Sequence, residues 1–447
     1  MNINNILIIG AGRSSSVLIT YMLNHAKELN ASVTVADADL ALAQQKINKH
    51  VAGKALQLDI TNTTALATAI KNSTIVVSML PAHLHTSVAV NCLQLKKNLI
   101  TASYISPEMK ALDADVKKAG LLFINECGLD PGIDHMSAMK IIDHLHAQKA
   151  TITSFKSYCG GLVAPQSNDN PWGYKFSWNP RNVILAGQAT AKYLLNGKIK
   201  YINYTNLFAE AEQLNIKKVG NFDVYANRDS LSYIVPYGLT KAQTVIRGTM
   251  REKNYCKAWN VLVQLGLTDD SFVIEDANKM RVVDFTQSFL RDITLTNFIK
   301  KCGHSSTSEV SKMIAWLDLE STAKLKIVKG TPAEILQSLL EVKWKLKKTD
   351  LDRIVMHHAF EYTLKGKKYN LQSSLARIGT NQIHTAMAET VGLPLAIATK
   401  LCLQGKFGKT TGVHMPTIPV LYNPILAELN DVFDMEFTEI VSEVIVF

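Results

Sequence analysis

The chain has 447 residues, 47% of them hydrophobic, and a formal net charge of +10. This length exceeds what a single hydrophobic core usually supports, so we expect two or three domains. No apolar run approaches the about 18 residues that a membrane span needs, and no dense Lys/Arg tract or aromatic RNA-binding signature accompanies the charge. We therefore expect a globular protein without a membrane or nucleic-acid partner, whose charge suits an anionic small-molecule substrate.

Two features favour a cytoplasmic location. Residues 1–5 contain no basic segment and lead directly into an expected strand, so we expect no secretory signal. The cysteines are scattered without a CxxC pair, which argues against a metal site or a disulfide framework and favours reduced thiols. They are Cys92, Cys127, Cys159, Cys256, Cys302 and Cys402.

A glycine-rich turn joins an expected strand, residues 5–9, to an expected helix, residues 17–29. Its glycines permit a tight turn and let the backbone approach a pyrophosphate at the helix N-terminus. The next strand, residues 32–36, ends at an aspartate where the ribose-binding acid belongs. This order predicts a Rossmann dinucleotide-binding domain; the alternative is a doubly wound domain that binds no dinucleotide. The expected cofactor residues are Gly10, Ala11, Gly12, Arg13, Ser14, Ser15 and Asp37.

Further strands are expected at residues 54–58, 73–80 and 98–102. The first ends at Asp59 and Ile60, which either edge an adenine pocket or merely precede a helix. The backbone at Val77 and Ser78 should face the cofactor. Ser103 and Tyr104 follow the last of these strands, at a strand end where site residues are expected. The alternative is that the serine caps a helix and the tyrosine ring packs in the core.

A sixth strand, residues 121–124, runs into the turn 125–135 (NECGLDPGIDH) and then a helix. The turn contains three residues with special backbone conformations, Gly128, Pro131 and Gly132, and several side chains that titrate. Ligands bind at the carboxyl ends of parallel strands, so this turn is a candidate site. The alternative is an ordinary turn with an aspartate N-cap.

The second half of the chain mixes strands and helices. Residues 151–159 and 243–251 are expected strands, and the aromatic loop 168–178 is either functional or a surface turn followed by core aromatics. Three arginines, Arg228, Arg247 and Arg251, either bind an anion or form ion pairs on an exposed sheet.

Helices are expected from 254 to 347, then a hairpin over 351–376, a helix over 385–404, and a final helix with a polar tail. His357 and His358 are adjacent on the hairpin and point to opposite faces, so a shared metal is not expected.

Seven segments resemble the glutamate-forming saccharopine dehydrogenase family (saccharopine reductase). They follow the family order along the chain, and the resemblance is weakest over 254–345. The segments are 101–107 (TASYISP), 125–135 (NECGLDPGIDH), 157–162 (SYCGGL), 170–178 (NPWGYKFSW), 227–230 (NRDS), 245–249 (VIRGT) and 391–400 (VGLPLAIATK).

The resemblance implies an α/β fold: a Rossmann-type doubly wound parallel sheet, a second mixed α/β domain and an all-helical insertion. The implied dinucleotide-binding domain is 1–132, completed by about 391–447. The mixed domain, for substrate binding and dimerisation, is 133–253 plus 348–390, and the helical domain is 254–347. A homodimer is also implied.

The implied reaction joins L-2-aminoadipate 6-semialdehyde to L-glutamate and reduces the imine with a nicotinamide to give saccharopine, or runs in reverse, in lysine metabolism. Tyr104, Asp130 and Cys159 match the family positions proposed for proton transfer. Arg228 and Arg251 match substrate positions, with Arg247 as an addition. The other implied substrate residues are Ser103, Tyr104, Asp130 and Thr249, and the other implied cofactor residues are Thr101, Leu129, Asp130 and Gly132.

We expect NAD to be preferred over NADP. Fungal members that use NADP carry a basic residue just after the second strand, and residues 35–39 (VADAD) contain none. Asp37 would repel a 2′-phosphate, although Arg13 could offset part of that repulsion.

Two rival functions remain open. A related imine reductase of the carboxynorspermidine or homospermidine type would need acidic groups for its cationic substrate, which the arginines argue against. A non-catalytic NAD-binding protein would be expected to have lost Arg228 or the turn 128–132, and both are present.

Overall fold

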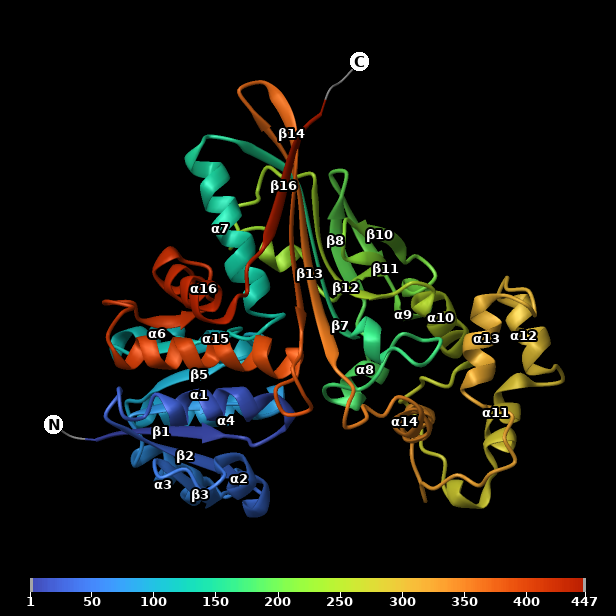
Figure 1. Cartoon of the computed structure of the whole chain (residues 1–447), viewed down its shortest axis with the longest axis horizontal. Coiled ribbons are helices and arrows are strands. Elements are labelled where there is room, and N and C mark those ends of the chain that lie inside the picture. Colours follow the sequence, from blue (N-terminus) through green and yellow to red (C-terminus); the bar gives the residue numbers. More distant parts are fainter. Residues whose placement is uncertain (1–2, 445–447) are drawn as a thin grey trace. The chain divides into compact units, whose positions relative to one another are not determined.

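The computed structural model describes residues 3–444 (Figure 1). Residues 1 and 2, which belong to the N-terminal segment where we expect no secretory signal, lie outside the described residues. The chain divides into two compact units. Unit 1 comprises Met1–Lys149 and Gly379–Phe437, and unit 2 comprises Ala150–Ile378 and Thr438–Phe447.

Unit 1 is built on a seven-stranded sheet within the described residues, in the order β15-β6-β5-β4-β1-β2-β3. Every neighbouring pair is parallel. The order therefore reverses beside β1, which creates a crevice at the carboxyl ends of β1 and β4. The strands are β1 Asn4–Ile9, β2 Ala31–Asp37, β3 Gly53–Gln57, β4 Ile75–Ser78, β5 Asn98–Thr101, β6 Leu122–Ile124 and β15 Gly412–His414.

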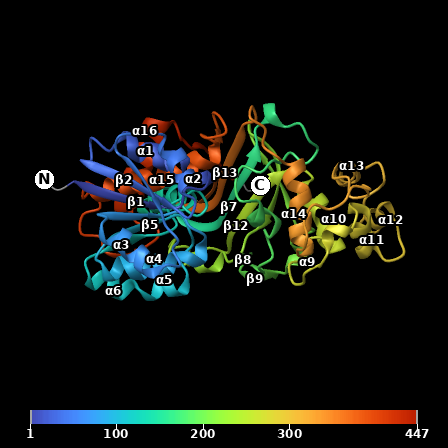
Figure 2. The ribbon, with the colours of Figure 1, turned by 90° about the horizontal axis from the view of Figure 1, so that it is seen from below.

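Helices cover both faces of this sheet, as expected for parallel strands that are apolar on both sides (Figure 2). Helices α1, α2 and α15 lie on one face, and α3, α4, α5 and α6 lie on the other. The helices of unit 1 are α1 Ser16–Asn24, α2 Leu40–Ile47, α3 Thr63–Lys71, α4 His85–Gln94, α5 Pro107–Ala111, α6 Asp113–Lys118, α7 Ile133–Ala147, α15 Ala386–Leu403 and α16 Pro419–Phe433.

Helix α15 is the one described helix whose length and hydropathy would suffice to cross a membrane, which the sequence reading did not anticipate. It is 78% buried, and a core helix meets the same criteria. Its Gly392 permits close packing on α1, because a Cβ there would lie 2.9 Å from the Leu18 nitrogen.

Unit 2 is built on a mixed sheet with the strand order β10-β11-β12-β7-β13-β14-β16, to which β8 and β9 add a side ribbon. β12 and β7 are parallel and the other neighbours in this order are antiparallel. The strands are β7 Thr151–Val163, β8 Ala191–Leu195, β9 Lys198–Ile202, β10 Glu212–Ile216, β11 Gly220–Ala226, β12 Thr244–Glu252, β13 Asp352–Leu364, β14 Lys367–Ile378 and β16 Thr438–Glu443.

One hydrophobic core joins this sheet to the helices of unit 2. The loop 168–178 supplies part of it: Trp172, Tyr174 and Phe176 are buried against Trp344. The expectation of core aromatics in that loop is therefore confirmed, and a function for the loop stays a prediction. The helices are α8 Pro180–Ile184, α9 Tyr204–Leu207, α10 Tyr255–Leu265, α11 Val282–Leu290, α12 Leu295–Lys301, α13 Glu309–Trp316 and α14 Pro332–Lys343.

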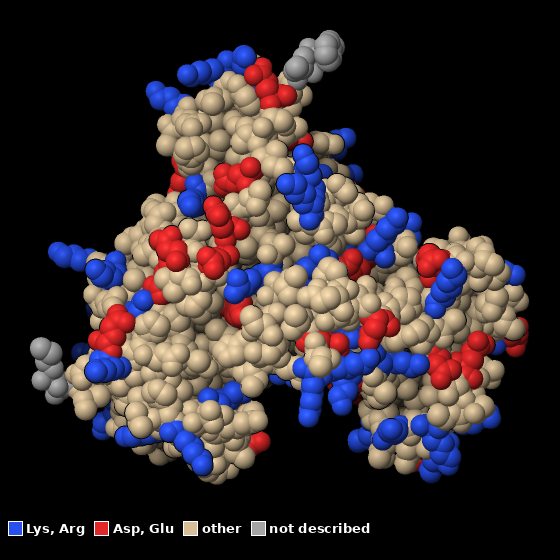
Figure 3. All heavy atoms as spheres, viewed as in Figure 1, with Lys and Arg blue, Asp and Glu red and all other residues tan. Residues whose placement is uncertain are grey.

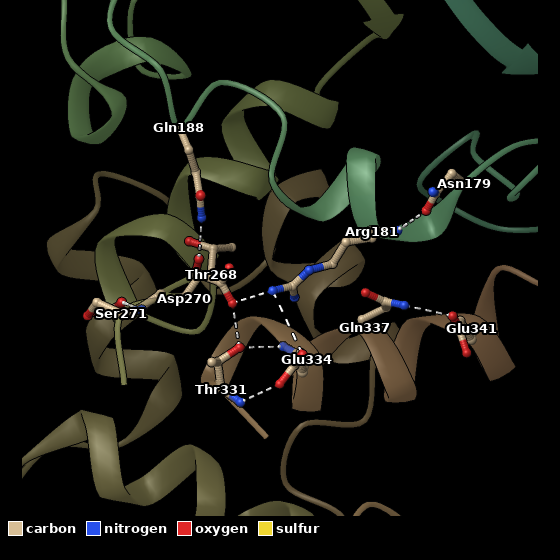
Figure 4. Close-up of polar contacts among 11 residues, drawn as sticks. Asn179, Arg181, Gln188, Thr268, Asp270, Ser271, Thr331, Glu334, Gln337 and Glu341 are labelled. Carbon is tan, nitrogen blue, oxygen red and sulfur yellow. Dashed lines mark hydrogen bonds and ion pairs between the residues drawn. The ribbon is translucent and has the colours of Figure 1, made fainter. Parts of the chain in front are cut away.

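A polar cluster ties α8 to α14 (Figure 4). Arg181 on α8 pairs with Asp270 and lies 3.9 Å from Glu334 on α14. Thr331, the N-cap of α14, donates its hydroxyl to the same Asp270 at 2.6 Å. The cluster fixes the start of α14 to the loop after α10.

The predicted fold class is confirmed. The prediction of a polar tail after the last helix is wrong for residues 438–443. These residues form β16, which pairs with β14. That pairing depends on a partner strand far away in the sequence, so no local pattern indicated it. The predicted domain boundaries stay a prediction. On the face drawn in Figure 3, Lys and Arg lie interspersed with Asp and Glu.

Candidate functional site

The glycine turn after β1 has the geometry of a dinucleotide cradle. Gly10 has φ +106°, and a Cβ there would lie 3.1 Å from the Met79 carbonyl group. At Gly12 a Cβ would meet nothing within 4 Å. Within residues 3–444 no side chain caps the helical turn that follows. Its N–H groups and exposed Arg13 suit a pyrophosphate, so the residues present fit a dinucleotide.

Asp37 holds this turn. Its Oδ2 accepts the Ala11 N–H at 2.7 Å, and its Oδ1 accepts the Asp39 N–H at 3.0 Å. Both carboxylate oxygens therefore already bind backbone at the end of β2.

Asp59 also serves a local turn. Its Oδ1 accepts the N–H and the hydroxyl of Thr61, and the Thr61 hydroxyl contact lowers the pKa of this carboxyl. Helix α3 is capped by Asn62 instead. The contact of Asp59 and Ile60 with adenine stays a prediction.

His85, at the start of α4, connects three expected site residues. Its Nδ1 lies 2.9 Å from Ser78 Oγ, and its Nε2 lies 2.7 Å from Ser103 Oγ and 3.2 Å from Thr101 Oγ1. Burial lowers the pKa of His85 to about 4, so the ring is neutral at pH 7. Sequence reasoning missed His85 because no local pattern marks this histidine as a site residue.

The turn 125–135 is closely packed. Gly132 has φ +150°, and a Cβ there would lie 2.0 Å from the Gly128 oxygen. Its neighbour Asp130 accepts a hydrogen bond from the Tyr104 hydroxyl at 3.3 Å. The structure thus brings together two of the three residues expected to transfer protons, at the ends of β5 and β6.

Two buried groups of this turn, Glu126 and His135, were not singled out as site residues. Glu126 Oε2 lies 2.8 Å from His135 Nε2, and both side chains are buried. Leu129 accepts the Asp134 N–H and so helps to shape the same turn.

Cys159 lies on β7 of unit 2, in register with Thr249 on the parallel strand β12. Arg247, two residues before Thr249, is buried with its guanidinium 4.1 Å from the centre of the Tyr233 ring. Arg228 is exposed in the loop after β11, at φ +47°. The substrate contacts of these residues stay predictions.

Arg251 occupies an aromatic environment. It is 3% exposed, and its guanidinium lies 5.4 and 5.5 Å from the ring centres of Tyr174 and Tyr255. The exposed-sheet interpretation is wrong for Arg247 and Arg251, because both are buried. A role for Arg251 in substrate binding stays a prediction.

Among residues 3–444, no group of three or more His, Cys, Asp or Glu could hold a metal ion.

Known proteins resemble the chain over almost its full length. Residues 6–124 match the saccharopine dehydrogenase NADP binding domain, and residues 128–434 match the saccharopine dehydrogenase C-terminal domain. The chain is 34% identical to saccharopine dehydrogenase (NADP(+), L-glutamate-forming) of Saccharomyces cerevisiae, over 97% of this chain and 98% of that protein. It is 32% identical to alpha-aminoadipic semialdehyde synthase of Arabidopsis thaliana, of which it covers 44%.

The fold agrees with this similarity. The solved apo structure of saccharopine dehydrogenase (L-Glu forming) from Saccharomyces cerevisiae superimposes with a TM-score of 0.89 at 33% identity, covering 98% of this chain and all of that one.

The predicted preference for NAD is wrong. The matched N-terminal family is an NADP-binding domain, and fungal relatives, among them that of Schizosaccharomyces pombe, are named as NADP(+) enzymes. In the structure Asp37 accepts the Ala11 and Asp39 N–H groups. The turn that it holds is therefore enough to explain an aspartate after β2, and its position in the sequence did not establish a preference for NAD.

Agreement in sequence along both units, and in fold along the whole chain, shows the family: the chain belongs to the saccharopine dehydrogenase family.

Proposed function

We propose that this protein is an NADP-dependent oxidoreductase that interconverts saccharopine with L-glutamate and L-2-aminoadipate 6-semialdehyde. In the oxidative direction saccharopine loses a hydride from the carbon of its C–N bond and a proton from nitrogen. Water then adds to the resulting imine, and the C–N bond breaks to release the aldehyde and glutamate. The cofactor supplies the hydride acceptor. The observation that carries the proposal is the 34% identity over 97% of the chain to an enzyme of that name.

The residues of unit 1 support cofactor binding and proton transfer. The glycine turn would hold the pyrophosphate, and Arg13 supplies a cation for a 2′-phosphate. Tyr104 and Asp130, 3.3 Å apart, form a donor and acceptor pair that can take a proton from the substrate amine and pass it on.

The residues of unit 2 support recognition of an anion. Saccharopine carries three carboxylates, and an arginine such as the solvent-exposed Arg228 can bind a carboxylate bidentately. Cys159 is the third expected proton-transfer group, placed next to Thr249 on the sheet.

The test measures NADPH formation by the purified protein with saccharopine and NADP⁺, and NADPH consumption with the semialdehyde plus glutamate. Putrescine in place of glutamate tests the polyamine reductase. Turnover with saccharopine supports the proposal. Turnover only with the diamine, or cofactor binding without turnover, would instead support the imine reductase or the non-catalytic protein.

We further propose a homodimer, supported by the family resemblance, and a cytoplasmic location, supported by scattered cysteines without a CxxC pair. Light scattering of the purified protein and fractionation of expressing cells would test these two statements.

A further inference from the structure

Glu126 holds the backbone on both sides of Tyr104. Its own N–H donates to the Ser103 carbonyl oxygen at 3.1 Å. Its side-chain Oε1 accepts the Ile105 N–H at 3.0 Å. One residue thus fixes the peptide groups that precede and follow Tyr104.

The backbone of Glu126 has an unusual conformation. Its φ is +53°, in the left-handed region that a residue with a long side chain seldom adopts. Such strain persists where the surrounding structure over-determines the conformation, and it gathers at functional sites. Here it directs the N–H and the carboxylate of the same residue to the same segment.

His135 fixes the carboxylate in turn. Its Nε2 lies 2.8 Å from Glu126 Oε2, with the imidazole fully buried. Its Nδ1 lies 3.7 Å from Asp134 Oδ2, while Asp134 Oδ1 accepts the Gly132 N–H at 2.6 Å. The series therefore runs from the turn that carries Asp130, through Asp134, His135 and Glu126, to the segment that carries Tyr104.

Stability alone does not account for this arrangement. A buried carboxylate and imidazole lose their hydration, and an apolar pair of similar volume is usually as stable or more stable. What the polar pair provides is a fixed position for two backbone groups beside the Tyr104 side chain. A hydrogen bond between two buried side chains is directional, which suits that purpose.

We propose that Glu126 and His135 are positioning residues, which hold Tyr104 at its 3.3 Å contact with Asp130 for proton transfer. The inference rests on the proposed function and adds to it two residues that act through Tyr104 rather than on the substrate.

The first test compares Glu126→Gln with Glu126→Met, which have similar side-chain length. Glutamine keeps a carbonyl oxygen for the Ile105 N–H, and methionine does not. We expect Glu126→Met to lower kcat about 100-fold, as a misplacement of a reacting group near 1 Å does. Glu126→Gln should recover much of that loss, and the Kd for NADP⁺ should stay unchanged in both. Equal losses in the two variants, or a loss in cofactor binding alone, would overturn the inference.

A matched control separates positioning from loss of stability. Ser106 caps α5 and directly follows Ile105, whose N–H Glu126 accepts. The Ser106 hydroxyl accepts the Met109 N–H at 3.1 Å. Ser106→Ala should lower the melting temperature with little change in kcat. His135→Gln, in contrast, should lower kcat as well.

A double-mutant cycle with Tyr104→Phe gives the sharper result. If Glu126 acts through Tyr104, then Glu126→Met should reduce kcat little further once the hydroxyl is gone. Losses that multiply would overturn the positioning role while leaving the proposed function intact. A Tyr104→Phe variant with full activity would overturn both the role of Tyr104 and the positioning role.

A spectroscopic readout does not depend on activity. Fluorotyrosine placed at position 104 gives one ¹⁹F signal, which should shift or broaden in Glu126→Met and change less in Glu126→Gln and in Ser106→Ala. An identical signal in all variants would overturn the inference, even if the wild type failed to oxidise saccharopine and the proposed function had to be abandoned.

Discussion

The hydroxyl of Tyr104 lies 3.3 Å from Oδ1 of Asp130, although the residues are 26 positions apart and follow different strands. The parallel sheet of unit 1 brings them together, because β5 and β6 are neighbours whose carboxyl ends meet at one edge. A pair assembled this way can pass a proton at an active site without either residue being a strong base in water.

We therefore predict that Asp130→Asn lowers kcat for saccharopine oxidation about 100-fold or more, in the range typical of a lost general acid–base group. The Kd for NADP⁺, measured by fluorescence titration, should change little because Asn keeps the shape of the side chain and the glycine turn is untouched. Loss of cofactor binding with normal turnover at saturation would instead show that Asp130 is structural.

Arg228→Ala should raise the KM for saccharopine. A lost hydrogen bond to a charged group costs about 1.5–3 kcal/mol, equivalent to about 10- to 150-fold in KM. Because Arg228 is exposed and solvent weakens its interactions with charges, we expect an increase in KM near the lower figure. Lys192→Met is the matched control, since Lys192 is a neighbouring exposed cation that lies 3.8 Å from Asp229. An unchanged KM in Arg228→Ala, or equal changes in the two variants, would exclude the role.

Lys175 should stabilise unit 2 far more than its neighbour Lys347 does. Lys175 is 2% exposed and contacts Asp350 at 2.7 Å and Asp169 at 2.8 Å. Lys175→Met leaves the Asp350 carboxylate without its buried partner, which should cost about 3–5 kcal/mol. Lys347→Met removes a solvent-exposed contact with Asp169 and should cost at most about 1 kcal/mol. Urea unfolding of both variants checks the difference, and similar losses would contradict it.

Two buried histidines should make stability depend on pH. Burial lowers the pKa of His85 and of His357 to about 4, whereas an unfolded histidine titrates near 6.5. Between these values the unfolded chain binds protons that the folded chain refuses, so stability is full above about pH 6.5 and falls toward pH 4. Each histidine contributes up to about 1.4 kcal/mol per pH unit. In His85→Asn the slope of unfolding free energy against pH should be smaller by that amount, and an unchanged slope would refute the assignment.

The sequence predicted features that depend on neighbouring residues, and it did not predict features that depend on residues far apart along the chain. The strands of unit 1 and the turns at Gly10 and Gly132 follow from apolar runs and backbone conformation, which neighbouring residues determine. The contacts of His85 with Ser103 and of Glu126 with the Ile105 N–H depend on where the chain returns after folding. A histidine or a glutamate looks the same in the sequence whether it is buried in a network or exposed.

Arg251 illustrates the same limit within unit 2. Its place in the strand pattern suggested an exposed cation beside Arg247, but its guanidinium is enclosed by rings from Tyr174 and Tyr255. Tyr255 begins α10, shortly after β12, but Tyr174 comes from the loop before α8, and no local pattern connects that loop to β12. The pairing of β16 with β14 was missed for the same reason.

The last prediction concerns the cofactor and separates Asp37 from Arg13. Arg13 is exposed in the glycine turn, so Arg13→Met should lower the affinity for NADP⁺ about tenfold, as the loss of a charged hydrogen bond would, while affecting NAD⁺ less. Asp37 holds the turn by accepting the Ala11 N–H at 2.7 Å. Asp37→Asn keeps one acceptor oxygen but loses the charge and can no longer serve both N–H groups with carboxylate oxygens, so both cofactors should bind more weakly and by similar factors. The measurement is the Kd of each variant for NADP⁺ and NAD⁺. If Asp37→Asn instead changed the ratio of the two affinities and Arg13→Met did not, Asp37 would be the residue that reads the ribose, and its hold on the turn would be incidental to cofactor choice.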